Sequence, residues 1–235
     1  MGQSSSKLLL FGGTGAIGSS VKEYFLSQGW EVLVITRGVS SDPDTLVWDP
    51  LSHSELSGSV LLGHGPFDAV CWAQGANCND SIYSFDRSKH QAIYDANVTF
   101  ILESLHFLLT NRCLSQPSRL CVISSIWQNM SRQNKLSYCV SKSAVQGLVL
   151  SLANDLASDG HLINAVLPGV LDTPMTRKNL SGAQIEKVIS STQFGRLSEL
   201  NDVASMVYML CSSMNTGVTG QFVNVDLGFS NARVI

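Results

Sequence analysis

Short apolar runs alternate along this chain with longer segments of helical periodicity, and this alternation restricts the possible fold more than any other feature. Strands separated by helices pair in parallel, and the helices cover the faces of the sheet. Seven runs are interpreted as strands, over residues 7–12, 31–36, 45–48, 67–73, 119–124, 161–167 and 221–226. The sequence therefore predicts an α/β fold with a seven-stranded parallel sheet and helices on both of its faces.

Three segments between these runs have clear helical periodicity, over residues 16–28, 95–110 and 138–157. In 95–110, Ile101 and Leu105 belong to a core stripe, while Phe107 adds apolar surface on another side. In 138–157, Val145 belongs to the core stripe and Ala144 to a second face of small residues. Two such faces favour packing against a second copy, so we expect a homodimer or homotetramer, with a tightly packed monomer as the alternative.

The length of 235 residues, 44% of them hydrophobic, is enough to bury one core as a single domain over residues 1–235. The stretch 37–66 is rich in Ser, Gly, Pro and Asp and is interpreted as a surface excursion around the third strand, with at most a short helix. We interpret residues 1–6 as a flexible tail. The alternative is a myristoylation signal, because Gly2 and Ser6 fit its pattern.

Charge, hydropathy and cysteine usage exclude several classes of function. The net charge of −3, with no basic run, argues against nucleic-acid binding. No apolar run approaches the length of a membrane span, so no membrane partner is expected. Six cysteines without a CxxC pair indicate reduced thiols in a cytoplasmic protein. No HExxH motif or Cys/His cluster is present, and no metal site is predicted.

A glycine-rich turn, FGGTGAIG, lies between the first strand and the first helix, with Gly12, Gly15 and Gly18 in a GxxGxxG spacing. Glycines allow the backbone to turn tightly and to approach a pyrophosphate, whose charge is stabilised by the free N–H groups at the helix N-terminus. A glycine-rich turn alone is weak evidence. Its position at a strand-to-helix junction in the first βαβ unit supports dinucleotide binding.

Tyr138 and Lys142 lie four residues apart in SYCVSK, where the helical pattern 138–157 begins. Positions i and i+4 share one helix face, and a cation near a phenol lowers its pKa, which suits a general acid or base. The alternative is a surface helix with an incidental pair. Ser125 stands 13 residues before Tyr138, at the end of a strand, and Asn97 stands 28 residues before Ser125.

These motifs together resemble the short-chain dehydrogenase/reductase family over nearly the whole chain. The resemblance rests on the glycine-rich turn, on the spacing of Asn97, Ser125, Tyr138 and Lys142, and on the segments PGVLDTPM and FGRLSELNDVASMVYMLCS. It implies a single Rossmann domain with a seven-stranded parallel sheet, and the length is similar to that of the β-ketoacyl carrier-protein reductases. The implied activity is NADPH-dependent hydride transfer between the nicotinamide and a small-molecule carbonyl or secondary alcohol.

The resemblance also implies a role for each of the four residues. Tyr138 would protonate the carbonyl oxygen and Ser125 would hydrogen-bond to it. Lys142 would lower the pKa of Tyr138 and hold the nicotinamide ribose, while the backbone carbonyl of Asn97 would bind a water that connects Lys142 to solvent. The competing hypothesis is a dinucleotide-binding sensor or assembly protein without catalysis, which has no physical need for Ser, Tyr and Lys at these spacings.

Further residues are expected to contact the cofactor. The second strand ends in VITRG, where NAD-preferring proteins of this fold have an acidic side chain, so Thr36 and Arg37 favour NADPH. Asp49 is expected to reach the adenine amine. The other predicted cofactor-binding residues, besides the glycines of the turn, Tyr138 and Lys142, are Thr14, Ala16, Ile17, Ala73, Gly75, Pro168, Gly169, Thr173 and Met175.

Four departures from the family pattern stand out. In the family's TGxxxGxG turn, Phe11 replaces the threonine and Ala16 the middle glycine, with Gly15 one residue earlier expected to supply the flexibility. WAQG at 72–75 replaces NNAG, so the asparagine contacts that brace the central strands are missing. DLG at 226–228 replaces DGG. Gln116 stands where carrier-protein reductases have a basic residue, which weakens a carrier-protein assignment.

Overall fold

The computed structural model describes residues 5–52 and 58–231. Its centre is a seven-stranded sheet in which every neighbouring pair of strands is parallel, in the order β3-β2-β1-β4-β5-β6-β7. The strands are β1 (Lys7–Phe11), β2 (Glu31–Thr36), β3 (Thr45–Val47), β4 (Phe67–Trp72), β5 (Leu114–Ile123), β6 (Leu162–Pro168) and β7 (Phe222–Val225). The predicted seven-stranded parallel sheet is confirmed.

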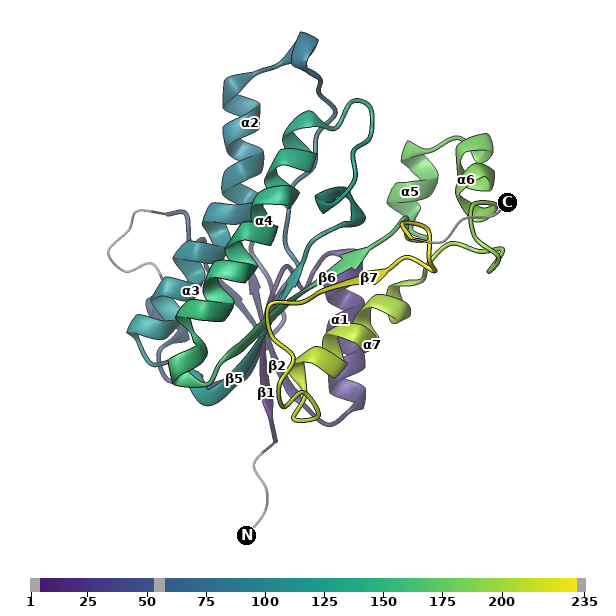
Figure 1. Ribbon diagram of the computed structural model, residues 1–235. Helices are drawn as coiled ribbons and strands as arrows, with labels where there is room; N and C mark the ends of the chain where they lie inside the picture. Colours follow the sequence, from purple (N-terminus) through teal and green to yellow (C-terminus); the bar gives the residue numbers. More distant parts are fainter. Residues whose placement is uncertain (1–4, 53–57, 232–235) are drawn as a thin grey trace.

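Two layers of helices cover the sheet (Figure 1). The first layer contains α1 (Ala16–Ser27) and α7 (Leu200–Cys211). The second contains α4 (Leu136–Asp155) and a long helix made of α2 (Arg87–Tyr94), a π-helical turn η3 (Asp95–Thr99) and α3 (Phe100–Thr110). Two short helices, α5 (Pro174–Asn179) and α6 (Gly182–Ile189), stand together beyond the end of β6 (Figure 1). Four 3-10 turns complete the described elements: η1 (Ser59–Leu61), η2 (Ile82–Ser84), η4 (Ile126–Gln128) and η5 (Ala157–Asp159).

The alternation of side chains along β1 explains the two layers. Leu8 and Leu10 belong to the apolar cluster under α1 and α7, whereas Leu9 and Phe11 belong to the cluster under α3 and α4. All four side chains are buried, because successive residues of a central strand point to opposite, covered faces. A continuous apolar run at this position is therefore the signature of a strand covered on both sides.

Two boundaries differ from the expected ones by more than two residues. β5 begins at Leu114 instead of residue 119, because Ser115, Gln116 and Pro117 interrupt the apolar pattern although the chain is already paired with β4. The long helix begins at Arg87 instead of residue 95, because α2 is polar and an apolar stripe does not reveal it. Asp86 caps the N-terminus of α2 by accepting hydrogen bonds from the amides of Ser88 and Lys89.

One described helix, α4, is long and apolar enough to cross a membrane, with 20 residues and a mean hydropathy of 1.2. The same properties characterise a helix that packs on a sheet. Val145, Leu148 and Val149 of α4 are buried in the cluster that covers β1, β4 and β5. This packing accounts for the buried apolar face of α4, whereas Val140 and Leu150 on the same helix are exposed. Residues 1–4 of the expected flexible tail lie outside the described residues, and the single-domain assignment stays a prediction.

Candidate active site

The predicted site residues come together at one edge of the sheet. In a parallel sheet all strands end at the same edge, and β1, β2, β4, β5 and β6 are followed there by the segments that contain these residues. The strand order reverses direction between β1 and β4, since the chain proceeds from β1 outward to β3 and then returns to β4. Open α/β sheets bind ligands outside this reversal point.

The glycine-rich turn is the part of this edge that follows β1. Gly12 has a φ of +77°, and a side chain there would lie 2.6 Å from the backbone nitrogen of Gln74. A side chain at Gly18 would overlap the carbonyl oxygen of Gly12. Gly15 has an ordinary φ of −80°, and a side chain there would make only an ordinary contact, 3.5 Å from the carbonyl oxygen of Gly12, so the backbone does not require a glycine at this position as expected.

The N-terminus of α1 is open to a ligand. Thr14, Gly15 and Ala16 are exposed, Ile17 is half-buried and Gly18 is buried. Within residues 5–52 and 58–231, no side chain makes a capping hydrogen bond to the α1 N-terminus, and the first turn of α1 contains no acidic residue. Free N–H groups and the positive end of the helix dipole therefore face the carboxyl edge of the sheet, which is the arrangement that binds a phosphate group.

Tyr138, Ser125 and Lys142 lie close together at the end of β5. Tyr138 and Lys142 lie on the first turns of α4, and Lys142 Nζ is 5.8 Å from the centre of the Tyr138 ring. Ser125 follows β5 as the N-cap of η4, where its side chain accepts a hydrogen bond from the amide of Trp127 at 3.3 Å. The same side chain lies close enough to Tyr138 to lower the pKa of the phenol. Lys142 Nζ is buried and donates to the carbonyl oxygen of Ile123, at 3.0 Å. The structure thus brings the three predicted side chains together.

The pKa values of this group differ from the expectation. Burial raises the pKa of Tyr138 above its ordinary value, and the hydrogen bond with Ser125 opposes this only in part. Burial also lowers the pKa of Lys142 to about 8. The expected lowering of the Tyr138 pKa by Lys142 is therefore not found, because desolvation of the phenol outweighs the other effects.

Asn97 lies in the π-helical turn η3, a local irregularity that often marks functional sites. Its buried side chain accepts a hydrogen bond from the amide of Ala76 at 2.8 Å and donates to the carbonyl oxygen of the same residue at 3.0 Å. It also donates to the hydroxyl of Ser141 at 2.8 Å. Asn97 thus connects α4 with the loop after β4, a contact that the sequence did not reveal.

The expected adenosine end of the site lies after β2 and β3. Thr36 ends β2 and accepts a hydrogen bond from the amide of Gly38, while Arg37 beside it is exposed. Asp49 stands two residues after β3 and accepts a hydrogen bond from the amide of Leu51. Arg37 is thus exposed at the end of β2, as the predicted preference for NADPH requires.

The residues that follow β4 and β6 line the same edge. Ala73 and Gly75 follow β4, and a side chain at Gly75 would lie 2.9 Å from Asn97 Oδ1 and 3.7 Å from Lys142 Nζ. Pro168 is the last residue of β6, and from Gly169 the chain leads to Thr173, the N-cap of α5. The side chain of Met175 lies outside the described residues. Apart from it, every predicted cofactor residue is found on this edge or on the first turns of the helices that leave it.

The residues present fit a nicotinamide dinucleotide. The glycine-rich turn leaves no room for side chains at Gly12 and Gly18, and the α1 N-terminus is uncapped. Gln74, whose backbone adjoins Gly12, has two buried side-chain polar atoms without a hydrogen-bond partner. Unsatisfied buried polar groups are costly, and a ligand rich in hydroxyl and phosphate oxygens supplies partners for them.

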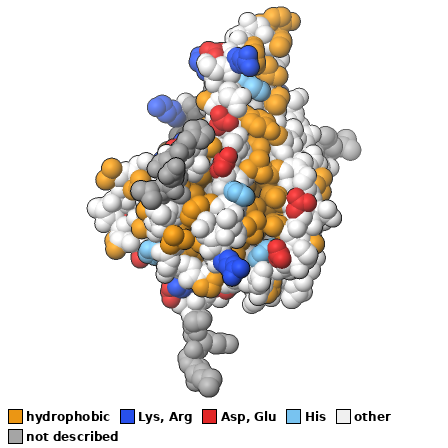
Figure 2. All heavy atoms as spheres, turned by 90° about the vertical axis from the view of Figure 1, so that its left-hand side faces the viewer, with side chains coloured by type: hydrophobic (Ala, Val, Ile, Leu, Met, Phe, Trp, Pro, Cys, Tyr) orange, Lys and Arg blue, Asp and Glu red, His pale blue; other side chains and the backbone are white. Residues whose placement is uncertain are grey.

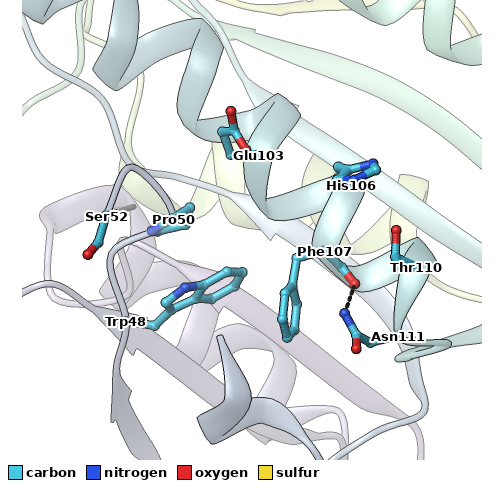
Figure 3. A pocket seen from close by; sticks show the side chains of 8 residues that line it. All are labelled: Trp48, Pro50, Ser52, Glu103, His106, Phe107, Thr110 and Asn111. Atoms are coloured by element: carbon cyan, nitrogen blue, oxygen red, sulfur yellow. Dashed lines mark hydrogen bonds between the residues drawn. The ribbon is translucent and has the colours of Figure 1, made fainter. Parts of the chain in front are cut away.

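A cavity of about 230 Å³ between the chain after β3 and the outer side of α3 lies apart from these residues (Figure 3). The rings of Trp48 and Phe107 line it side by side, with centroids 5.1 Å apart and an interplanar angle of 56°. The amide of Asn111 donates to the carbonyl oxygen of Phe107 at 2.9 Å. None of the predicted site residues lines this cavity.

This fold and this edge define a dinucleotide-binding α/β protein. A family model described as enoyl-(acyl carrier protein) reductase matches residues 51–230. The chain therefore belongs to the short-chain dehydrogenase/reductase family and is similar to the ketoacyl carrier-protein reductases within it. As a member of this family it is an oxidoreductase that binds a nicotinamide dinucleotide and acts on small molecules.

Individual relatives resemble the chain over nearly its full length. It is 24% identical to the 3-oxoacyl-(acyl-carrier-protein) reductase FabG of Salmonella typhimurium, over 94% of this chain and 95% of that protein. It is 28% identical to a 3alpha-hydroxysteroid dehydrogenase of Mediterraneibacter gnavus, over 93% of this chain and 94% of that protein. The gluconate 5-dehydrogenase of Burkholderia cenocepacia, solved with NADP and tartrate, has the same fold, with a TM-score of 0.85, 18% identity, and coverage of 98% of this chain and 97% of that one.

Proposed function

We propose that the chain is an NADPH-dependent carbonyl reductase, or the corresponding secondary-alcohol dehydrogenase, that uses Ser125, Tyr138 and Lys142. The observation that carries this proposal is the position of Lys142 Nζ, 5.8 Å from the centre of the Tyr138 ring, with the Ser125 side chain close enough to the phenol to lower its pKa. A protein that only binds a dinucleotide has no use for this arrangement. All three side chains adjoin the edge of the sheet at which the glycine-rich turn ends.

Tyr138 acts as the general acid in reduction. Because burial raises the pKa of Tyr138, its phenol holds its proton at neutral pH and donates it to the carbonyl oxygen. When bound, the nicotinamide supplies the hydride that the carbonyl carbon accepts. Ser125 donates a hydrogen bond to the same oxygen and stabilises the negative charge that develops there. In the alcohol-oxidising direction Tyr138 takes the proton back.

Lys142 and Asn97 support this proton transfer. Lys142 holds the nicotinamide ribose, and its ammonium, with a pKa of about 8, is able to exchange protons near neutral pH. Asn97 contributes its backbone carbonyl to a water that connects Lys142 with solvent. A side chain at Gly75 would lie close to both Asn97 Oδ1 and Lys142 Nζ, which shows that these two polar groups adjoin the loop after β4.

NADPH is the proposed cofactor because Arg37 is exposed directly after Thr36, where an acidic side chain would favour NADH. The planar guanidinium pairs well with a phosphate on the adenosine ribose. The gluconate 5-dehydrogenase with the same fold was solved with NADP. A cytoplasmic location agrees with this cofactor and with six free thiols.

A panel of carbonyl and alcohol substrates tests the proposal. The panel contains a 3-oxoacyl thioester, a 3alpha-hydroxysteroid and gluconate, because relatives are named for these compounds. Turnover is followed by the absorbance of reduced nicotinamide, with NADPH and NADH for reduction and with the oxidised forms for the reverse reaction. We expect turnover of at least one carbonyl or alcohol pair, with NADP(H) preferred.

The variant Tyr138→Phe then tests the mechanism. It keeps the ring but removes the proton donor, so we expect activity to fall by about 10²–10⁴-fold with unchanged affinity for NADPH. Tyr83→Phe is the matched control, because the Tyr83 ring is 99% exposed and remote from the packed core. Activity of Tyr138→Phe within about tenfold of the wild type would rule out the proposed acid.

A further inference from the structure

The first turn of α4, which carries Tyr138, has no cap of its own. The helix begins at Leu136, and its N-cap residue Lys135 makes no side-chain capping hydrogen bond. The first amides of a helix need acceptors from outside the helix, because no earlier carbonyl is available to them. In this protein one residue from a distant loop supplies these acceptors.

That residue is Asp80, in the loop that follows β4. Its backbone carbonyl accepts the amide of Leu136 at 3.3 Å, and its carboxylate accepts the amide of Ser137 at 3.1 Å. The hydroxyl of Ser137 donates a further, short hydrogen bond to the same carboxylate. Asp80 is only 9% exposed, and its negative charge lies at the positive end of the α4 dipole.

The carboxylate is held in its ionised form. Burial alone raises the pKa of Asp80, but the hydrogen bonds from the hydroxyl and amide of Ser137 outweigh this effect and keep the pKa below its ordinary value. Because the single hydroxyl proton of Ser137 goes to this carboxylate, Nδ1 of His90 on α2 donates to the Ser137 oxygen, at 2.8 Å. Ser137 thus has partners on two other segments.

The loop after β4, which contains Asp80, makes further hydrogen bonds with the segment before α4 and with η3. Asp80 donates its own amide to the carbonyl of Asn134, and Lys135 Nζ donates to the carbonyl of Cys78 at 3.2 Å. At the other end, Ala76 is bound by the side chain of Asn97. Tyr138 therefore stands in the first turn of α4, and the start of this helix is fixed by hydrogen bonds to a distant loop and not by a capping side chain of Lys135.

We propose that Asp80 is a positioning residue for Tyr138, acting through the main chain and hydroxyl of Ser137. It touches neither substrate nor cofactor in this role. It fixes the first turn of α4 so that the Tyr138 hydroxyl stays beside the side chain of Ser125. This inference rests on the proposed function of Tyr138, and it adds a residue that the tetrad of Asn97, Ser125, Tyr138 and Lys142 does not contain.

The test compares Asp80→Ala with Asp86→Ala. Asp86 is a matched control because it also caps a helix, α2, through the amides of Ser88 and Lys89, but that helix does not carry Tyr138. For Asp80→Ala we expect kcat to fall by about 100-fold, since small displacements of a reacting group have effects of this size, while the Kd for NADPH changes by less than about twofold. Asp86→Ala is expected to leave kcat unchanged.

Backbone amide exchange in the ligand-free protein gives a second readout that does not depend on activity. We expect exchange in the segment 136–140 to become about tenfold faster in Asp80→Ala and to stay the same in Asp86→Ala. Asp80→Asn retains an oxygen that accepts the Ser137 amide, so it should restore part of both readouts. If Asp80→Ala does not fold, Asp80→Asn and Ser137→Ala are compared with the wild type in the same way.

Several outcomes overturn the inference. Unchanged kcat and unchanged exchange in Asp80→Ala exclude a positioning role, and so does an equal loss of kcat in Asp86→Ala. If the wild-type protein reduces no carbonyl substrate at all, the proposed function fails, but the exchange measurement still decides whether Asp80 holds the Tyr138 turn.

Discussion

The aromatic rings of Phe11 and Trp72 lie parallel to each other at the ends of β1 and β4, with an interplanar angle of 1° and centroids 5.8 Å apart. The family pattern has a threonine at the first position and an asparagine at the second. The two departures therefore occur in one contact, and the central strands are braced by an aromatic pair instead of by asparagine. Trp72 also donates its indole N–H to the hydroxyl of Ser104 at 2.8 Å.

A double-mutant cycle tests this contact. We expect Phe11→Leu and Trp72→Leu to be coupled by about 0.5–1.5 kcal/mol in the free energy of unfolding, because each variant removes the same ring contact. Denaturant titration of the wild type, both single variants and the double variant gives the coupling. Phe25 is the control, since it lies in the apolar cluster on the opposite face of the sheet, and Phe25→Leu should be additive with Phe11→Leu.

The stability of the protein should depend on pH through Lys142. Burial lowers its pKa from 10.5 to about 8, so between these values the unfolded chain holds a proton that the folded chain has released, and stability rises with pH. Below pH 8 the folded chain carries the full cost of the buried charge. Relative to that of Lys142→Met, the free energy of unfolding of the wild type should increase by on the order of 3 kcal/mol between pH 8 and 10.5.

Denaturant titrations of both proteins across this pH range measure the difference. Lys89→Met, a change on the exposed surface of α2, serves as the control and should follow the wild type at every pH. If the wild type and Lys142→Met differ in their free energy of unfolding by the same amount at every pH, burial does not destabilise the Lys142 ammonium.

Arg37→Ala should weaken NADPH binding by about 10–100-fold, because a charge-assisted hydrogen bond to the phosphate is lost. NADH binding should stay the same, since NADH lacks that phosphate. Quenching of protein fluorescence gives both dissociation constants. Arg87→Ala removes an exposed arginine at the start of α2 and should affect neither cofactor. Equal weakening of both cofactors by Arg37→Ala would contradict the proposed phosphate contact.

We expect a homodimer or homotetramer in solution. Apolar side chains gather over the face formed by α2, α3 and α4 (Figure 2), and Leu102 and Leu150 on it are 46% and 52% exposed. Light scattering should give two or four times the chain mass of 25.4 kDa. The double variant Leu102→Glu/Leu150→Glu should lower the mass toward that of one chain, whereas Leu62→Glu, at an exposed leucine after η1, should not.

Much of the fold and of the site could be predicted because the relevant signals are local. The run LLLF is apolar at every position, as a central strand covered on both faces must be, and α4 shows its core face through the spacing of Val145, Leu148 and Val149. The separation of Tyr138 and Lys142 by four residues fixes their common helix face. The direction in which parallel strands run then brings the ends of β1, β4 and β5 to one edge.

The tertiary structure alone decided the contacts and charges that depend on distant segments. The cap of Asp80 on Ser137 joins residues 57 positions apart, and no spacing rule predicts it, because the two segments meet only when β4 and α4 take their places in the sheet and its helix layer. The raised pKa of Tyr138 has the same origin. A neighbouring lysine can be seen in the sequence, but desolvation is a property of everything packed around the phenol, and it is the larger effect.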